Sequence, residues 1–399
     1  MGITWLRGNA LTLLENGTEF FPALETAIDG ATTEIFLETY IFAHDDTGHR
    51  IAAALSRAAG RGVCVRLLVD GFGGRDFVEH LQAPLDAAEV NVQIYRREVA
   101  PLSLRRHRLR RLHRKIAVID GRLAFVGGIN IISDDNAPPE LRPHYDYAVR
   151  IEGPTLAQVH HAVRRMWEIV SWANFKRRFR HTPISTPCCT IAGEQTAAFL
   201  IRDNIRHRND ILNAYLDAIE QAQSEILIAN AYFMPGVRFG RALYAAAQRG
   251  VRITVLLQGK TDHQLLRYAT QALYATALRA GIRIFEYEKS FMHAKVAVID
   301  GTWATVGSSN IDPFSLLLAK EANLVIRDAL FGSELRNSLK QAIAEGIRAT
   351  MWVGDTTAAS GFNTFDGFLK SVKAELGVRI AELLELKPDV VVQFVHEVG

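Results

Sequence analysis

The stretch "HRKIAVIDGRLAFVGGIN" covers residues 113–130, and residues 293–310 read "HAKVAVIDGTWATVGSSN". Eleven of the eighteen aligned positions are identical. Each copy places two apolar runs around an Asp-Gly pair, which is a strong signal for a β-hairpin. A chain that contains the same phrase twice, 180 residues apart, is an internal duplication, and this repeat decides the fold.

The repeat extends beyond this phrase. Residues 21–42 align without gaps with residues 212–233, and both stretches have helical spacing of apolar residues followed by a short β-rich run. Residues 56–71 match residues 244–259, where a helical stretch ends at an Arg-Gly pair and a continuous apolar run follows. Helices that alternate with buried strands predict an α/β layer architecture in each half.

The duplication also suggests the domain organisation. We expect a first half at residues 1–185 and a second half at residues 186–350, divided within the proline-containing segment 180–190. Residues 351–399 have no counterpart in the first half, and residues 370–386 read as an amphipathic helix. The pattern of this tail indicates no function.

Composition limits the class of protein. Hydrophobic residues make up 48% of the chain and the net charge is +3, so the chain has enough apolar residues for a full core and is not a polyanion binder as a whole. The three cysteines lack zinc-type spacing, which favours a reducing compartment. We find no signal peptide and no transmembrane segment, and therefore expect any membrane contact to be peripheral, at the cytoplasmic face.

The hairpin predicts a cluster of polar side chains. Side chains alternate across a strand, so His113 and the lysine two residues later share one face. If the loop is residues 121–122, His113 lies opposite Asn130, and the equivalent loop in the second copy places His293 opposite Asn310. This convergence depends on register, because a slip of one residue would send each asparagine to the other face.

These residue types suit chemistry at phosphorus. Histidine can act as a nucleophile or as a general acid and base, lysine adds positive charge and asparagine adds amide donors for the phosphoryl oxygens. One histidine cannot both attack phosphorus and protonate the leaving oxygen, whereas two can divide these roles. Packing accounts for the repeated apolar residues but not for the repeated His-x-Lys and Asn.

At these residues the sequence resembles the phospholipase D superfamily, and within it the bacterial cardiolipin synthases of the B type, over roughly residues 1–345. The signature is His-x-Lys-x4-Asp followed by Gly-Gly/Ser-x-Asn. The two copies of that signature are His113, Lys115, Asp120, Gly127, Gly128, Asn130 and His293, Lys295, Asp300, Gly307, Ser308, Asn310. The tail departs from the pattern of these relatives.

The resemblance implies a duplicated α/β/α sandwich whose halves are related by a pseudo-twofold axis, with the active site between them. It implies that His113 forms a phosphohistidine and that His293 protonates the leaving group and then deprotonates the incoming alcohol. The groups expected to hold the phosphoryl oxygens are Lys115, Lys295, Asn130 and Asn310. We expect no metal or other cofactor.

Two further pairs of carboxylates belong to the motif region. Asp120 and Asp300 are part of the catalytic signature but lie off the reactive face by parity, so we interpret them as structural supports for the site. Asp146 and Glu321 align with each other, 33 and 28 residues after their histidines. The superfamily uses such a carboxylate to orient each imidazole, and we assign them this role.

Two basic clusters bear on the partner. The first half has about ten extra residues before its motif, within residues 96–115, and residues 172–181 form a second cluster of basic and aromatic residues. Such mixtures suit an anionic membrane surface, single-stranded nucleic acid or a solvated face. The resemblance favours lipid, so the expected membrane contacts are Arg105, Arg106, Arg108, Arg110, Arg111, Lys176, Arg177 and Arg178, with no nucleic-acid partner.

The predicted function is a phosphatidyl transferase that joins two phosphatidylglycerol molecules into cardiolipin and releases glycerol. Alternatives are a phospholipase D that transfers to water, a phosphodiesterase or nuclease of the same superfamily, and a membrane-binding protein with an inactive site. The complete His, Lys and Asn sets argue against the last of these. The residues do not specify the donor lipid, the acceptor alcohol or the oligomeric state.

Overall fold

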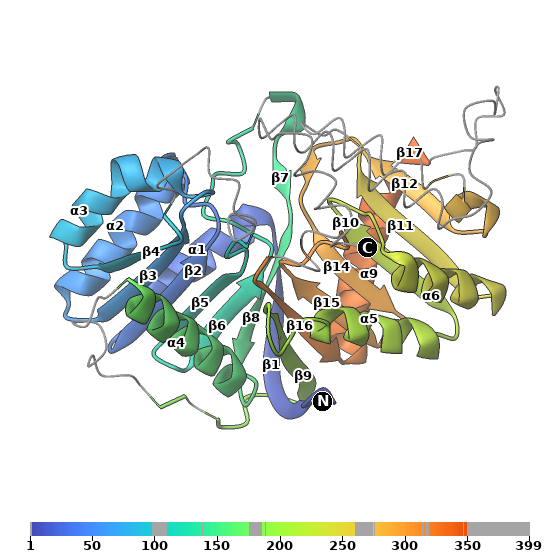
Figure 1. Ribbon diagram of the computed structural model, residues 1–399, viewed down its shortest axis with the longest axis horizontal. Helices are drawn as coiled ribbons and strands as arrows, with labels where there is room; N and C mark the ends of the chain where they lie inside the picture. The colour runs from blue at the N-terminus through green and yellow to red at the C-terminus, as the bar shows by residue number, and fades with distance from the viewer. Residues whose placement is uncertain are drawn as a thin grey trace, which may run out of the picture.

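Among the residues that the structure describes, a large sheet of fifteen strands runs through both halves (Figure 1). The computed structural model describes residues 2–97, 110–137, 139–174, 186–187, 189–259, 274, 276–312, 315, 319–345 and 347–348. These ranges leave out most of both basic clusters, most of the predicted boundary segment and all of the tail at 351–399. The predicted domain limits therefore stay predictions.

Helices and strands alternate in both halves as predicted. The first half comprises β1 (Leu6–Glu15), α1 (Asn16–Asp29), β2 (Glu34–Thr39), α2 (Asp46–Gly60), β3 (Cys64–Asp70), η1 (Phe77–Leu81), α3 (Gln82–Ala87), β4 (Asn91–Tyr95), β5 (Lys115–Ile119), β6 (Leu123–Gly127), η3 (Pro139–Leu141), β7 (His144–Tyr145), β8 (Tyr147–Glu152) and α4 (Leu156–Ala173). The second half comprises β9 (Gln195–Arg202), α5 (Asp210–Gln221), β10 (Glu225–Asn230), α6 (Val237–Gln248), β11 (Arg252–Gln258), β12 (Arg283–Tyr287), β13 (Phe291–Met292), β14 (Lys295–Ile299), β15 (Trp303–Gly307), β16 (Glu321–Arg327), α9 (Ala329–Ala344) and β17 (Ile347–Arg348).

The order of the strands displays the duplication. From the middle of the sheet to one edge the order is β1-β8-β6-β5-β2-β3-β4, and toward the other edge it is β9-β16-β15-β14-β10-β11-β12, with β17 beyond. Each strand of the first series corresponds to the strand at the same place in the second. The two series join where β1 pairs antiparallel with β9, Leu6 opposite Ala197. The predicted duplicated α/β fold is therefore confirmed, and its two sheets are hydrogen-bonded into one.

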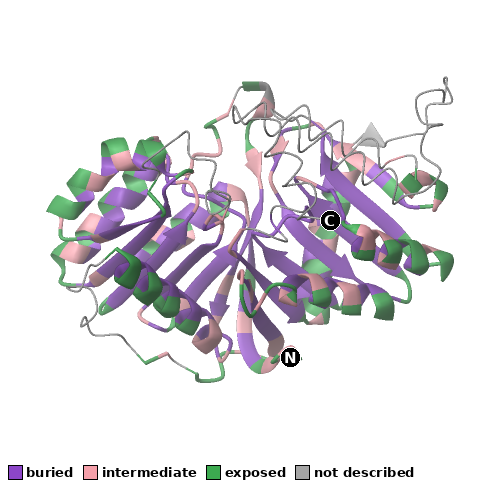
Figure 2. Cartoon of the chain, viewed as in Figure 1, coloured by how far each residue is buried: buried purple, intermediate pink, exposed green. Residues whose placement is uncertain are grey.

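The described residues form three apolar cores between the layers. The helices α1 and α2 cover one core of the first half, and α5 and α6 cover the corresponding core of the second. A third, central core combines strand residues of both halves with side chains such as Trp167 of α4 and Leu335 of α9. Figure 2 shows the strands almost entirely buried and the helices exposed along their outer sides. The shared core places the two half-sites next to each other.

Across the described ranges, every helix is too short or too polar to traverse the hydrocarbon of a bilayer.

The hairpins have a register different from the predicted one. Lys115 lies opposite Gly127 and Ile119 opposite Leu123, so the turn is residues 120–122 and not 121–122. The second hairpin has the same register, with Ile299 opposite Trp303. The prediction was wrong by one residue because the turn begins at the aspartate, whose backbone takes a positive φ of 51° in both copies.

The turn aspartates are structural supports, in agreement with the interpretation of the sequence. The Asp120 carboxylate accepts hydrogen bonds from the backbone N–H groups of Thr32, Thr33 and Glu34 and from both threonine hydroxyls, at 2.8–2.9 Å. Asp300 accepts the equivalent bonds at the start of β10. Each aspartate thus ties its hairpin to the neighbouring strand, away from the reactive groups.

We expect Asp120→Asn to destabilise the protein in a pH-dependent way. Partial burial raises the pKa of Asp120, but the hydrogen bonds outweigh this effect and lower the pKa to about 2. A carboxyl whose pKa is lower in the folded state stabilises that state above the unfolded pKa of about 3.9 and loses this contribution as pH falls toward 2. Urea unfolding at pH 7 should show a loss of about 1–3 kcal/mol, the usual cost of hydrogen bonds to a charged group.

The same measurement at pH 3 should show a smaller difference between variant and wild type. Asp135→Asn is the matched control, because Asp135 is exposed beside the cavity segment and takes no part in the hairpin. A deficit for Asp120→Asn that stays constant from pH 7 to pH 3 would contradict the role of the ionised carboxylate.

Candidate active site

The two halves are joined by backbone pairing next to both histidines. Strand β7 pairs in parallel with β13, and the Tyr145 carbonyl accepts the His293 N–H at 2.8 Å. The equivalent bridge joins Leu112 to Lys320, whose carbonyl accepts the His113 N–H at 2.9 Å. Each histidine is therefore anchored by a segment of the opposite half.

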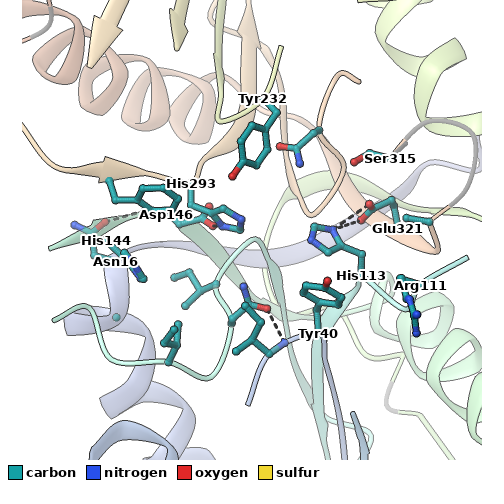
Figure 3. A pocket seen from close by; sticks show the side chains of 18 of the residues that line it. Asn16, Tyr40, Arg111, His113, His144, Asp146, Tyr232, His293, Ser315 and Glu321 are labelled. Atoms are coloured by element: carbon teal, nitrogen blue, oxygen red, sulfur yellow. Dashed lines mark hydrogen bonds and ion pairs between the residues drawn. The ribbon is translucent and has the colours of Figure 1, made fainter. Parts of the chain in front are cut away.

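The carboxylate partners also come from the opposite half. His113 Nδ1 lies 3.0 and 3.1 Å from the two carboxylate oxygens of Glu321, and His293 Nδ1 lies 2.7 Å from Asp146 Oδ2 (Figure 3). Counting each carboxylate from the histidine of its own half implied the other pairing, and that pairing was wrong. The reason is the backbone bridging, which carries Asp146 to His293 and Glu321 to His113.

Both imidazoles line one cavity of about 550 Å³ between the halves. A carboxylate at Nδ1 favours the tautomer with the proton on that nitrogen, as in a catalytic triad, and leaves Nε2 free to react. Two imidazoles with free Nε2 atoms at one cavity can act on a single phosphorus from two sides. This is the arrangement that the repeated phrase predicted.

The protonation of the two histidines depends on charge inside the cavity. Burial lowers the pKa of His113, and burial together with Lys295 and Lys115 lowers the pKa of His293 well below its usual range. Neutral imidazole is the nucleophilic form, which suits attack on phosphorus. A bound phosphodiester would add negative charge and favour protonation of one of the pair, as a general acid requires.

The two motif lysines contact the backbone carbonyls of the histidines. Lys115 Nζ donates to the His113 carbonyl at 2.7 Å, and Lys295 Nζ contacts the His293 carbonyl and lies 3.7 Å from Asp146 Oδ2. Burial lowers the pKa of Lys115 to about 7 and that of Lys295 to about 8. Neither is among the described residues that line the cavity. Their direct contact with a phosphoryl oxygen therefore stays a prediction, and the negative charge of a bound phosphodiester would favour the protonated form of both lysines.

Both motif asparagines line the cavity. Asn130 follows the end of β6 instead of lying on the strand, so the wrong register did not move it from the site. Its Oδ1 accepts the Ile41 N–H at 3.1 Å, which leaves the amide N–H groups available. Asn310 is buried and, within the described residues, its Oδ1 has no hydrogen-bond partner. These amides are suited to bind a phosphoryl or hydroxyl oxygen.

Several cavity residues were not found from the sequence. They are Asn16, Tyr40, Asp134, His144, Tyr232, Phe291, Asp312 and Ser315. The ring of Tyr40 stands edge-on to the His113 imidazole with a centroid distance of 4.9 Å. Tyr40 and Tyr232 both follow the aligned strands β2 and β10, and these repeated segments were the available signal.

Of the predicted membrane contacts, the structure describes Arg110 and Arg111. Arg111 lines the cavity beside His113. The remaining predicted contacts, Arg105, Arg106, Arg108, Lys176, Arg177 and Arg178, lie outside the described residues.

Comparison with known proteins agrees with this geometry. A family model described as "Cardiolipin synthase, PLD-like domain" matches residues 24–167 and 215–343, which contain the two motif copies. The chain is 40% identical to cardiolipin synthase B of Escherichia coli K12 over 86% of this chain and 83% of that protein. It is 32% identical to a probable cardiolipin synthase, YwiE, of Bacillus subtilis, over 90% of this chain and 72% of that protein. Among solved structures, phosphatidylserine synthase of Haemophilus influenzae has the same fold, with a TM-score of 0.68, 14% identity and 96% coverage of both chains.

Proposed function

The chain belongs to the cardiolipin synthase family of PLD-like phosphatidyltransferases, and from this premise we propose that it makes cardiolipin from two phosphatidylglycerol molecules and releases glycerol. The observation that carries the proposal is the pair of imidazoles at one cavity, each held at Nδ1 by a carboxylate of the other half. This pair supplies the nucleophile and the acid that exchange of one alcohol for another at phosphorus requires.

The first step forms a phosphohistidine. His113 Nε2 attacks the phosphorus of the donor lipid, and the bond from phosphorus to the glycerol oxygen breaks. His293, protonated at Nε2, gives its proton to that oxygen, and glycerol leaves. Asn130 and Asn310 donate to the phosphoryl oxygens, and Lys115 and Lys295 stabilise their negative charge.

The second step returns the site to its starting state. A hydroxyl of the second phosphatidylglycerol loses its proton to His293 Nε2 and attacks the phosphorus. The bond between phosphorus and His113 breaks, cardiolipin leaves and His293 is again protonated. Water in place of the second lipid would give phosphatidic acid, and this hydrolysis is the second candidate function, since the cavity is open to solvent.

Incubation of the purified protein with phosphatidylglycerol vesicles tests the proposal. Mass spectrometry of the lipids should detect cardiolipin, with glycerol released in equal amount. Phosphatidic acid as the sole product would support the hydrolase instead, and unchanged lipid would refute both.

A cation-aromatic cluster next to the cavity supports an anionic membrane as the partner. Phe72 is 40% exposed, and the guanidinium carbons of Arg75 and Arg111 lie 4.5 and 5.0 Å from its ring centroid. Arg111 also lines the cavity. Arginine beside an exposed aromatic ring suits an anionic headgroup layer. We propose the cytoplasmic face as the location, where thiols such as free Cys64 remain reduced.

We expect vesicle binding to depend on salt. Exposed charges are screened over about 8 Å at physiological ionic strength, so binding to phosphatidylglycerol vesicles should fall as salt rises. Flotation at low and high salt, with phosphatidylcholine vesicles as the neutral control, measures this effect. Equal binding to both lipids, or binding that salt does not change, would contradict an electrostatic dock.

A further inference from the structure

The two ends of the active-site cavity differ in chemistry. Arg111 is the only arginine or lysine among the described cavity residues, and it lies beside His113 (Figure 3). The end beside His293 instead contains Asn16 and His144 (Figure 3), and Asp134 belongs to this end because its carbonyl accepts the His144 N–H. The proposed mechanism uses neither Asn16 nor Asp134, although both line the cavity into which His293 faces.

Asp134 is held in a defined position at this end. Its Oδ1 accepts the Gly17 N–H at 3.2 Å, and its own carbonyl accepts the His144 N–H at 3.0 Å. A Cβ atom at Gly17 would lie 2.7 and 2.8 Å from the two carboxylate oxygens, so the carboxylate packs directly against the first turn of α1. The carboxylate can approach this closely only because residue 17 is glycine.

Hydrogen bonds connect this position to His293. Asn16, next to Gly17, accepts the Asp146 N–H with its side-chain oxygen at 3.1 Å and donates its own N–H to the Asp146 carbonyl at 2.8 Å. Asp146 in turn holds His293 Nδ1. These bonds fix the positions of Asn16 and of the first turn of α1, which holds Asp134, with respect to the His293 imidazole. In the proposed mechanism this imidazole protonates or deprotonates the alcohol.

The carboxylate has acceptor capacity left for a ligand. An ionised carboxylate has about four lone-pair positions, and the backbone of α1 does not occupy all of them. Burial raises the pKa of Asp134 to about 6, so at neutral pH the group is still mostly ionised. A carboxylate next to an amide is well suited to accept hydrogen bonds from hydroxyl groups.

We infer that Asp134, assisted by Asn16, recognises the hydroxyl adjacent to the reacting oxygen of a polyol alcohol. Glycerol as leaving group and the glycerol end of a second phosphatidylglycerol as acceptor share this vicinal pair of oxygens. One oxygen reacts under the control of His293, and the neighbouring hydroxyl donates to Asp134. The inference rests on the proposed function and adds the residue that would make the enzyme select a polyol over other alcohols.

A competition between alcohols tests this selectivity. A short-chain phosphatidyl p-nitrophenol loads the enzyme in the presence of equal concentrations of glycerol and 1-propanol, and mass spectrometry gives the ratio of the two phosphatidyl alcohols. The wild type should favour glycerol, and Asp134→Asn and Asp134→Ala should lower the product ratio about tenfold or more, as expected for loss of a hydrogen bond to a charged group. Asp135→Ala, at the exposed neighbouring carboxylate, is the matched control and should keep the ratio.

The ratio does not depend on how much protein is folded, and release of p-nitrophenol shows that the variants still react. A wild type without preference for glycerol, or Asp134 variants that keep the preference, would overturn the inference and leave the proposed function intact. Ethanolamine included as a third alcohol, if preferred over glycerol through Asp134, would replace the polyol by an ammonium ligand and also overturn it. Phosphatidic acid as the sole wild-type product would refute the proposed transfer, and the inference with it.

Discussion

His113→Ala is expected to abolish transfer from every donor, whereas His293→Ala should lose the first step, formation of the phosphohistidine, only with donors whose leaving group needs a proton. Without the His113 imidazole no phosphohistidine can form, whatever alcohol departs. Without His293 the nucleophile remains, and p-nitrophenolate can leave unprotonated. General acid help contributes about 10²–10⁴-fold, so the loss in His293→Ala should be of this size with phosphatidylglycerol and should shrink with the p-nitrophenyl ester.

The burst of leaving group in the first turnover, measured with both donors, gives this difference, because later turnovers still need His293 to deprotonate the acceptor. Acid quench followed by peptide mapping locates the phosphoryl group. The wild type and His293→Ala should both carry it on His113. His160 provides a matched control, because it is buried against Glu34 in the core and does not line the cavity. A phosphoryl group found on His293 in the forward reaction would reverse the assignment.

The carboxylate variants should follow the histidine of the other half. Asp146→Asn, in the first half, should behave like His293→Ala and recover with the p-nitrophenyl donor. Glu321→Gln, in the second half, should behave like His113→Ala and not recover. An amide in place of the carboxylate removes the negative charge and can hold the imidazole in the wrong tautomer, which in the Ser-His-Asp triad costs about 10⁴-fold.

The comparison of donors separates this result from general damage. A misfolded variant loses activity with both donors, so only recovery with one of them identifies the partner of His293. Asp135→Asn is the control for removing an acidic side chain near the cavity. If Glu321→Gln recovers and Asp146→Asn does not, the roles of nucleophile and general acid have been assigned to the wrong histidines.

Much of the site follows from the sequence because the repeat aligns residues that share a local environment. The hairpins and the positions of the histidines depend on nearest neighbours along the chain and across one turn. The strand register failed by one residue because an Asp-Gly pair allows more than one turn, and the hydrogen bonds that select one of them come from Thr32 and Thr33, far away in sequence.

Contacts between the halves could not be found in this way. Whether Asp146 meets His113 or His293 depends on the pairing of β7 with β13, and two-residue strands have no recognisable pattern. The strands β1 and β9, which join the two sheets, were missed because they lack the repeated motif that revealed the others. Asp134 was missed because nothing in its own segment indicates that its carboxylate would pack against Gly17.

The crossed pairs make the protein equivalent to a twofold dimer whose subunits have been joined in one chain. In a true homodimer both half-sites must be identical, because one sequence supplies both. Here Ser308 donates a hydrogen bond to Glu321 at 2.5 Å, while a side chain at the equivalent Gly128 would begin 2.3 Å from Asp146 Oδ1. Because the two copies are joined in one chain, the carboxylate that holds each histidine can have different neighbours. A symmetric scaffold can therefore serve a reaction whose two steps are unlike.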